Sequence, residues 1–390
     1  MIILKCFTVC IFDKMFPKKL QKKIDERKAN SAFRELHHSN NKIDFSSNDY
    51  LGFSNSKTIF DNAHNYLNTH NLKQNGATGS RLLSGNHKLY SKLETDISKI
   101  HKSKAALIYN SGYDANIGLL SSVPQRGDII LYDEYCHASI RDGIKMSNAK
   151  TYKFRHNDLE DLKKLILRFT LNDNSQLYIV TESVFSMDGD SPDIKDLINL
   201  SKIYNANIII DEAHALGIFK NGLVQHFGLE SDIFARIITF GKALGCHGAA
   251  ILGSQELKDY LVNFSRSLIY TTALPPHSLA TIKMAYEELE TTNQIEELQK
   301  NIILFKSEVS RFQLKDLFIE SESAIHCCII SGNDKVKSIA LKIQNKGFDI
   351  KPILSPTVPI NKERLRFCLH SYNSKEEISE VLALLATFAM

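Results

Sequence analysis

The sequence has no CxxC pair among its seven cysteines, so neither a zinc site nor a disulfide framework is indicated. The cysteines are scattered along the chain: Cys6, Cys10, Cys136, Cys246, Cys327, Cys328 and Cys368. Two of them lie in the largely apolar run 325–330, which predicts buried thiols in a strand. We therefore expect reduced thiols and a cytoplasmic protein.

The chain also lacks a segment that could span a bilayer or act as a secretory signal. Residues 1–12 are apolar, but they are interrupted by Lys5, closed by Asp13 and not followed by a small-residue cleavage site. Met15 is an alternative start, which would make residues 1–14 an extension. We expect no membrane partner.

A strong excess of one charge is absent as well. The 48 basic and 44 acidic residues give a formal net charge of +4, which offers no case for a nucleic-acid partner. The basic stretch 18–23 is interpreted as the polar face of a first helix over 20–36.

Short β-rich runs alternate with helix-like segments between about residues 105 and 253. Strands are expected at 105–109, 128–132, 151–154, 177–181, 207–211, 237–240 and 249–252, with amphipathic helices such as 159–169 and 194–204 between them. This alternation predicts an α/β fold with a mostly parallel central sheet covered on both faces. Ligands of such sheets bind beyond the carboxyl ends of the strands.

The pattern changes after Pro275-Pro276. Helices are expected over 277–312, near 334–346 and from Lys375, and strands at 325–330, 348–353 and 364–370, which indicates a smaller C-terminal α+β domain. We predict three parts: an N-terminal extension and helix (1–45), a large α/β domain (46–285) and the C-terminal domain (286–390).

The first candidate group is the acid that ends the apolar strand 207–211. Asp211 is followed three residues later by His214. A strand-end carboxylate suits the pyridine nitrogen of pyridoxal 5'-phosphate (PLP), whose ring must stay protonated to withdraw electrons. A helix N-cap is the plain alternative, and metal binding by both residues is a weaker one.

A lysine follows the next apolar strand, between two glycines. Lys242 stands in Gly241-Lys-Ala-Leu-Gly245. Burial would lower the pKa of its amine and favour a nucleophile. A phosphate-binding GxxxxGK[ST] loop is excluded, because Arg236 and Ala243 occupy its diagnostic positions.

Two further turns complete the candidate site. In Tyr109-Asn-Ser111-Gly112-Tyr113 a strand is followed by small residues and the start of a helix. Such a helix start can present N–H groups to a phosphate. An ordinary strand–turn–helix connection would have the same sequence pattern. His137 could lie on a cofactor ring, or it could cap a helix. Phosphate turn, stacking histidine, acid and lysine follow the order of PLP enzymes with the aminotransferase-like fold (fold type I).

The sequence resembles the α-oxoamine synthase family of PLP-dependent acyltransferases from about residue 20 to its end. The motifs that carry the resemblance are Ser47-Asn-Asp-Tyr-Leu-Gly52, Gly76-Ala-Thr-Gly-Ser-Arg-Leu-Leu-Ser-Gly-Asn-His87, Phe185-Ser-Met-Asp-Gly-Asp190, Asp211-Glu-Ala-His214, Thr239-Phe-Gly-Lys242 and Pro356-Thr-Val-Pro359. The second is close to the version typical of the 8-amino-7-oxononanoate synthases, which act in biotin biosynthesis. Other synthases of the family usually differ there.

The resemblance implies a role for each matching residue. Lys242 would form the Schiff base with PLP and move protons, Asp211 would pair with the pyridine nitrogen, and His137 would stack on the ring. The remaining positions fall into three sets: His214 and Ser186 near the phenolic oxygen; Ser111, Gly112, Tyr113, Thr239 and, from the neighbouring subunit of a homodimer, Thr271 or Thr272 at the phosphate; and Arg34, Asn48, His137, Thr357 and Arg366 at the substrates. No metal is implied.

The implied reaction joins an amino acid to an acyl thioester with loss of CO2. The expected substrates are L-alanine and a pimeloyl thioester on CoA or an acyl carrier protein; glycine, serine or another acyl-CoA are the alternatives. The arginine that the family often has before Pro-Thr-Val-Pro is absent at Leu354. Arg366 is the nearest replacement, although a strand-surface role is an equal alternative. A catalytically silent homologue is disfavoured because Lys242, Asp211 and His137 are all present.

Overall fold

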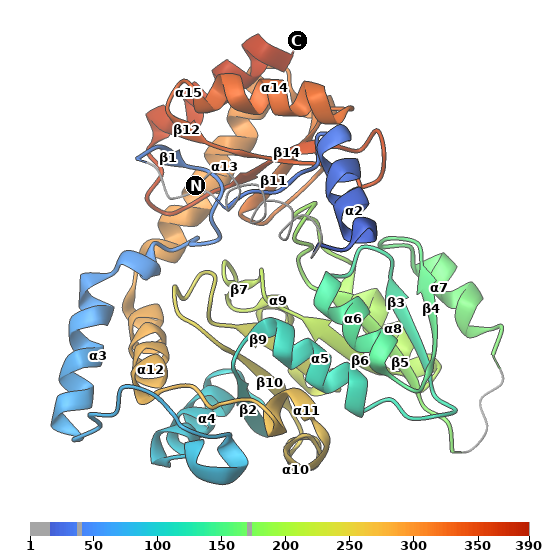
Figure 1. The fold of residues 1–390 in the computed structure, drawn as a ribbon, viewed down its shortest axis with the longest axis vertical. Helices are drawn as coiled ribbons and strands as arrows, with labels where there is room; N and C mark the ends of the chain where they lie inside the picture. The colour runs from blue at the N-terminus through green and yellow to red at the C-terminus, as the bar shows by residue number, and fades with distance from the viewer. Residues whose placement is uncertain (1–15, 37–40, 170–173, 390) are drawn as a thin grey trace, which may run out of the picture.

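The structure, a computed structural model, describes residues 16–36, 41–169 and 174–389 of the chain. Cys6, Cys10 and Met15 therefore lie outside the described residues. Two units stand one above the other in Figure 1, a larger one built on a broad sheet and a smaller one that carries the C-terminus.

The larger unit is built on a seven-stranded sheet with the order β2-β10-β9-β6-β5-β3-β4. Every neighbouring pair is parallel except those of β10, which runs antiparallel to both β2 and β9. The prediction of a mostly parallel sheet is confirmed. The strands are β2 (Ala105–Tyr109), β3 (Ile129–Asp133), β4 (Lys150–Phe154), β5 (Leu177–Glu182), β6 (Asn207–Asp211), β9 (Ala235–Thr239) and β10 (Ala249–Gly253).

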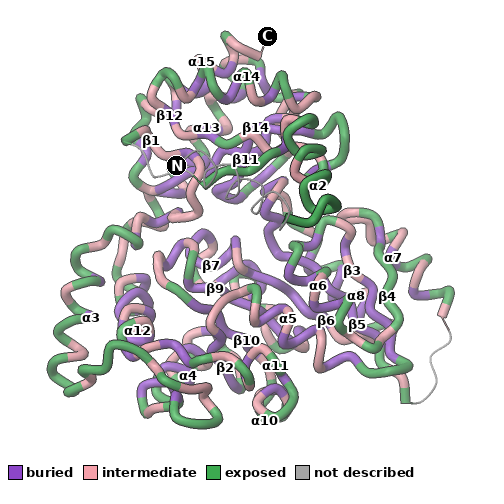
Figure 2. The backbone as a smooth tube through the Cα atoms, viewed as in Figure 1, coloured by how far each residue is buried: buried purple, intermediate pink, exposed green. Residues whose placement is uncertain are grey.

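Helices cover both faces of this sheet. Side chains of β6 alternate between two apolar clusters: Ile208 and Ile210 enter the larger cluster and Ile209 the smaller one. Each of these buried isoleucines contributes roughly 1.5–3 kcal/mol of burial free energy. The central strands β5 and β6 are buried along almost their whole length (Figure 2), as strands covered on both faces are. The larger cluster takes side chains of α4 (Lys88–Ile100), α8 (Ile194–Ile203) and α12 (Pro276–Thr291), and the smaller one those of α5 (Gly112–Ser122), α6 (Ala138–Met146) and α10 (Gln255–Phe264).

Other elements lie along the chain before, between and after these strands and helices. They are α3 (Lys57–Thr69), α7 (Leu159–Ile166), α9 (Leu223–His226) and α11 (Arg266–Ile269), the two-stranded ribbon of β7 (Leu216–Gly217) and β8 (Lys220–Asn221), and single turns η1 (Phe53–Asn55), η2 (Arg81–Gly85), η3 (Glu230–Asp232) and η4 (Lys315–Leu317).

The smaller unit has an antiparallel sheet in the order β11-β14-β13. Its strands are β11 (Ile325–Ile329), β14 (Arg364–Cys368) and β13 (Lys351–Ile353), and its helices are α13 (Gln294–Arg311), α14 (Asn333–Gln344) and α15 (Lys375–Ala389). Cys327 and Cys328 are buried in β11, as predicted, and the described cysteines are free thiols. β1 (Ile43–Asp44) pairs with β12 (Phe348–Asp349), so the N-terminal segment crosses to this unit.

The loop 185–190 ties the two units together. Gly189 has a φ of 80°, and an added Cβ would lie 2.0 Å from the carbonyl oxygen of Ile325. Its own carbonyl oxygen accepts hydrogen bonds from the hydroxyls of Ser321 and Ser323, and the preceding Asp188 forms a buried ion pair with Arg364. This close contact brings β14 up to the edge of the large sheet.

The first helix differs from the expectation. α2 (Lys18–Ala29) ends at Ala29 with Asn30 as its C-cap, and Ser31 has a left-handed φ of 52°, so the expectation of a helix that continues to Leu36 is wrong. No residue of α2 is buried, and the basic side chains therefore do not form one face opposite a packed one. Within the described ranges, no helix is long and apolar enough to cross a membrane.

Candidate active site

Residues with catalytic chemistry gather where the parallel strands end. Ser111 follows β2, His137 follows β3, Asp211 is the last residue of β6, and Lys242 comes shortly after β9. The carboxyl ends of parallel strands meet at one edge of a sheet, so these side chains share one location. Lys242 and Asp211 indeed both perturb the pKa of His137.

Asp211 is 5% exposed, and hydrogen bonds fix its carboxylate. Oδ2 accepts from the side-chain amide of Asn116 at 2.7 Å, and Oδ1 accepts from the backbone N–H of Ala213 at 2.9 Å. The second bond closes a local turn after the strand; no helix of the described residues begins there, so the helix N-cap alternative for Asp211 is wrong. A carboxylate held in this way can face a protonated ring nitrogen without reorientation.

Lys242 is partly buried beside these groups. Burial lowers the pKa of its amine to about 8, and the positive charge of Arg366 acts in the same direction, whereas Asp211 and Glu182 oppose the shift. A substantial fraction of the amine is therefore neutral near pH 8, as a Schiff-base nucleophile and proton carrier requires.

His137 is the N-cap of α6, and its ring is held in one orientation. Nδ1 accepts from the backbone N–H of Ser139 at 3.2 Å and lies 2.8 Å from the Ser139 hydroxyl, which itself accepts from Asn116 at 3.0 Å. Burial, Lys242 and Arg141 lower the pKa of the imidazole. A neutral ring with its proton on Nε2 satisfies these contacts.

A chain of hydrogen bonds joins His214 to Arg366. His214 Nδ1 lies 2.7 Å from the Tyr50 hydroxyl, which lies 3.2 Å from Asn48 Oδ1. That amide oxygen accepts from Arg366 at 2.9 Å, and Arg366 also donates to the carbonyl oxygen of Ser186 at 2.7 Å. Burial, followed by the charges of Lys242 and Arg366, holds the pKa of His214 well below its usual range. Arg366 is 8% exposed, so the strand-surface alternative is wrong.

The start of α5 offers a site for a phosphate group. Ser111 caps the helix by accepting from the backbone N–H of Asp114 at 3.0 Å. An added Cβ on Gly112 would lie 3.7 Å from the Thr239 side chain and meet nothing closer. A helix N-terminus beside an open glycine and a threonine suits an anion, which fits the phosphate of PLP.

The other residues expected at the phosphate surround this turn. The exposed Tyr113 donates its hydroxyl to Asp142 at 2.8 Å. The Asn110 amide donates to the Thr271 hydroxyl at 3.1 Å and to the carbonyl oxygen of Thr272 at 2.7 Å. Both threonines therefore lie next to the phosphate turn of their own chain.

Arg34 and Thr357 form a separate pair. The Arg34 guanidinium donates to the Thr357 hydroxyl at 3.4 Å, which joins the N-terminal segment to the loop before β14. The sequence reasoning missed Glu182, Tyr50 and Asn116. Glu182 carried a usable signal, because it ends an apolar strand as Asp211 does. For Tyr50 and Asn116 the signal was only their place inside motifs.

A group able to hold a metal ion occurs once among the described residues, at His156, Asp188 and Asp190. Its members already have partners: His156 lies between Asp133 and Asp190, and Asp188 pairs with Arg364. The buried, fixed cation of Arg364 opposes a second cation there. Asp211 and His214, weighed above as metal ligands, are instead bonded to Asn116 and Tyr50.

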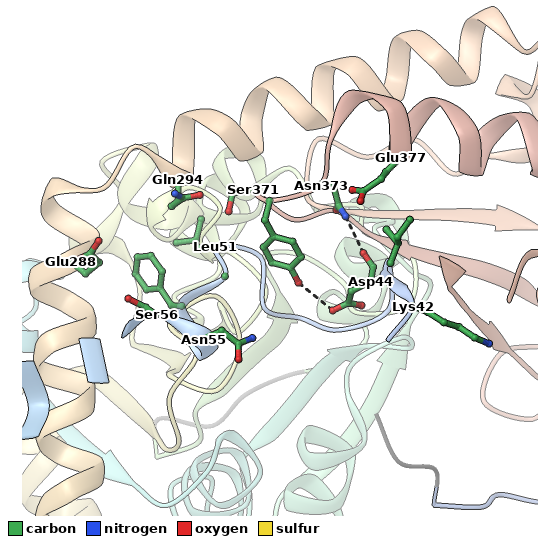
Figure 3. Close-up of a pocket in the computed structure, with 14 residues that line it drawn as sticks. Lys42, Asp44, Leu51, Asn55, Ser56, Glu288, Gln294, Ser371, Asn373 and Glu377 are labelled. Carbon is green, nitrogen blue, oxygen red and sulfur yellow. Dashed lines mark hydrogen bonds between the residues drawn. The ribbon is translucent and has the colours of Figure 1, made fainter. Parts of the chain in front are cut away.

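A cavity of about 660 Å³ is lined by residues of both units (Figure 3). Its lining includes Tyr372 and Asn373, whose side chains both donate hydrogen bonds to Asp44, and the carboxylates Glu288 and Glu377. Its lining includes none of the residues that surround Lys242. We therefore assign it no part in the reaction.

Comparisons with known proteins agree with this geometry. Residues 40–385 match the family described as aminotransferase class I and II. The 8-amino-7-oxononanoate synthase of Emericella nidulans is 39% identical over 367 residues, which is 89% of each chain. The solved 8-amino-7-oxononanoate synthase of Francisella tularensis is 27% identical with a TM-score of 0.74, covering 89% of this chain and 97% of that one.

Serine palmitoyltransferase of S. paucimobilis, solved with a PLP adduct, is 25% identical with a TM-score of 0.82, covering 89% of this chain and 87% of that one. The matched region contains every residue gathered around Lys242. With the fold, the phosphate turn, Lys242 and Asp211 in place, the chain belongs to the aminotransferase class I and II family, and within it to the PLP-dependent acyltransferases known as α-oxoamine synthases.

Proposed function

We propose that the protein condenses L-alanine with a pimeloyl thioester to give 8-amino-7-oxononanoate, CO2 and the free thiol, a step of biotin biosynthesis. The observation that carries the proposal is the 39% identity, over 89% of the chain, to a protein named 8-amino-7-oxononanoate synthase. The lysine, aspartate and two histidines at one sheet edge support the same class of chemistry.

The chain's own residues perform the binding and the proton transfers. PLP, when bound, supplies an electron-withdrawing ring that stabilises negative charge on the substrate's α-carbon. The Asp211 carboxylate keeps that ring protonated, and the Asn116 amide keeps the carboxylate in place. Lys242, with a pKa of about 8, takes the α-proton and returns it, a role typically worth ~10²–10⁴-fold in rate.

Arg366 and Asn48 are the proposed carboxylate contacts for the amino acid. The Arg366 guanidinium is buried next to Lys242, whose pKa its charge helps to lower. Its hydrogen bonds to Asn48 and to the Ser186 carbonyl oxygen fix its orientation. An arginine held from two sides suits a planar carboxylate, and it would compensate for the leucine at position 354.

Arg34 and Thr357 are the proposed contacts for the acyl thioester. The pair lies close to a cavity of about 680 Å³ between α2 and the smaller unit, whose lining includes Ala32 and Pro356. Its volume falls within the ~300–1,000 Å³ that is usual for small-molecule sites.

We further propose a homodimer in which Thr271 or Thr272 reaches the coenzyme phosphate of the partner subunit. Both residues lie on the surface segment after α11, where Tyr270 is 73% exposed. The hydrogen bonds from Asn110 hold this segment beside the phosphate turn of its own chain. In a dimer whose two-fold axis runs next to this turn, the same segment lies close to the phosphate site of the partner subunit.

The test is product identification by mass spectrometry after incubation with alanine, glycine or serine and either pimeloyl-CoA or pimeloyl carrier protein. We expect 8-amino-7-oxononanoate with alanine and no product from a Lys242→Ala control. A preferred product from glycine, serine or another acyl-CoA would replace the proposed substrates with those of a sister synthase. No product with any pair, and no uptake of PLP, would favour the silent homologue.

A further inference from the structure

Glu182 is a second buried carboxylate in the site, and the reaction outlined above does not use it. It is the last residue of β5, stands opposite Asp211 in the register of β5 with β6, and is 3% exposed. Burying a carboxyl group in this way is unfavourable unless its oxygens are bonded. Oε1 accepts from the backbone N–H of His137 at 2.6 Å.

This bond holds the backbone N–H of His137, a group for which α6 itself provides no acceptor. The imidazole is oriented by Ser139, which contacts Nδ1 through its hydroxyl and its N–H. The backbone of His137 stands at the first turn of α6, where N–H groups have no partner within the helix. Together Glu182 and Ser139 hold the backbone N–H and the imidazole of His137.

The charge state of Glu182 indicates whether the residue acts by positioning His137 or by its electrostatic effect on the site. Burial, and then the nearby charge of Asp211, raises the pKa of this carboxyl to about 8, although Lys242 and the His137 N–H act against the shift. The raised pKa favours the uncharged form, in which the group adds little to the negative charge that Asp211 already provides. What it offers His137 in either state is an oxygen acceptor.

We propose that Glu182 is a positioning residue that sets the height and tilt of the His137 ring over the coenzyme, through the hydrogen bond to the His137 backbone. The inference rests on the proposed function in one respect, since it takes His137 to lie on the PLP ring. It requires an acceptor at position 182 and no charge.

The test uses two substitutions of similar volume in the PLP-loaded enzyme. Glu182→Gln retains an acceptor oxygen, and Glu182→Met removes it. The readouts are the visible circular dichroism of bound PLP, which reports the asymmetry of the ring's surroundings, and the dissociation constant of PLP. Glu134→Met is the matched control, because Glu134 is a partly buried carboxylate directly after β3 that contacts the backbone N–H of His156 and Lys153 rather than His137.

We expect Glu182→Gln and Glu134→Met to keep the wild-type dichroism and affinity, and Glu182→Met to weaken PLP binding about tenfold and change the dichroism, the scale of one lost hydrogen bond to a buried group. In a His137→Ala background the further effect of Glu182→Met should vanish.

Two outcomes would overturn the inference. If Glu182→Gln behaves like Glu182→Met, the charge matters rather than the acceptor; if Glu182→Met has the same effect with and without His137, its role is structural. Should His137→Ala leave the dichroism unchanged, the stacking role of His137 fails too. Product formation from alanine is measured separately, so that failure of the proposed function is recognised on its own.

Discussion

Replacing His156 by glutamine is expected to remove a large part of the pH dependence of the enzyme's stability above neutral pH. His156 Nδ1 lies 2.9 Å from Asp133 Oδ1, and Nε2 lies 2.8 Å from Asp190 Oδ2. Tyr135 stacks on the ring and Phe185 meets its edge. The imidazole thus joins the ends of β3 and β4 to the loop 185–190, which carries the contact between the two units.

The magnitude follows from the charge on this ring. Burial disfavours the imidazolium, but the hydrogen bonds and charges of Asp133 and Asp190 outweigh it and raise the pKa of His156 to about 9. Relative to the ordinary value of 6.5, at about 1.4 kcal/mol per pH unit, the charged ring stabilises the fold by roughly 3 kcal/mol. Because the folded-state pKa is the raised one, this stability is complete below about pH 6.5 and is lost as the pH rises through about 9.

The assay is urea unfolding of the PLP-loaded enzyme at closely spaced pH values from about 6 to 10. The difference in unfolding free energy between wild type and His156→Gln should shrink by roughly 3 kcal/mol across this range. Groups such as Glu182 that titrate in both proteins cancel in the difference. His64→Gln, on the exposed side of α3, is the control: its difference in free energy of unfolding from wild type should stay constant across this range. If the free energy of unfolding of His156→Gln also changes with pH as that of wild type does, the charged contacts of His156 with Asp133 and Asp190 do not stabilise the fold.

Three further outcomes are expected. Asp211→Asn should lower the rate of product formation about 100-fold or more while the protein keeps its fold, checked by steady-state kinetics and far-ultraviolet circular dichroism. Arg366→Lys should raise KM for the amino acid about tenfold or more with a smaller change in kcat, since a bidentate contact is lost; an unchanged KM would remove Arg366 from the carboxylate site. Gly189→Ala should destabilise the fold by roughly 3 kcal/mol or more, seen in urea unfolding, because its Cβ would meet the carbonyl oxygen of Ile325 and φ is positive.

Much of the fold could be predicted because its signals are local. Strands β2 and β6 coincide with the predicted 105–109 and 207–211, and β9 is displaced by only one or two residues from 237–240. A continuous apolar run followed by a polar residue marks both the strand and its end. The placement of Asp211 and Lys242 at one edge then follows from parallel pairing alone.

The remainder depended on contacts between distant segments. From the sequence, Arg366 is one residue of a strand whose side chains alternate between the two faces. Only the docking of β14 against the loop 185–190 buries it beside Asn48. The helix expected to reach Leu36 stops at Ala29 because residues 30–34 bond to α14 and to the loop at Thr357 instead. A sequence pattern carries no information on such partners.

The most direct test of the central claim is the position of the covalent label after borohydride reduction of the PLP-loaded enzyme. Peptide mass spectrometry should find the reduced coenzyme on Lys242 alone, and the visible absorption band should disappear with the reduction. Label on another lysine, or none in a protein that binds PLP, would contradict the account of this site.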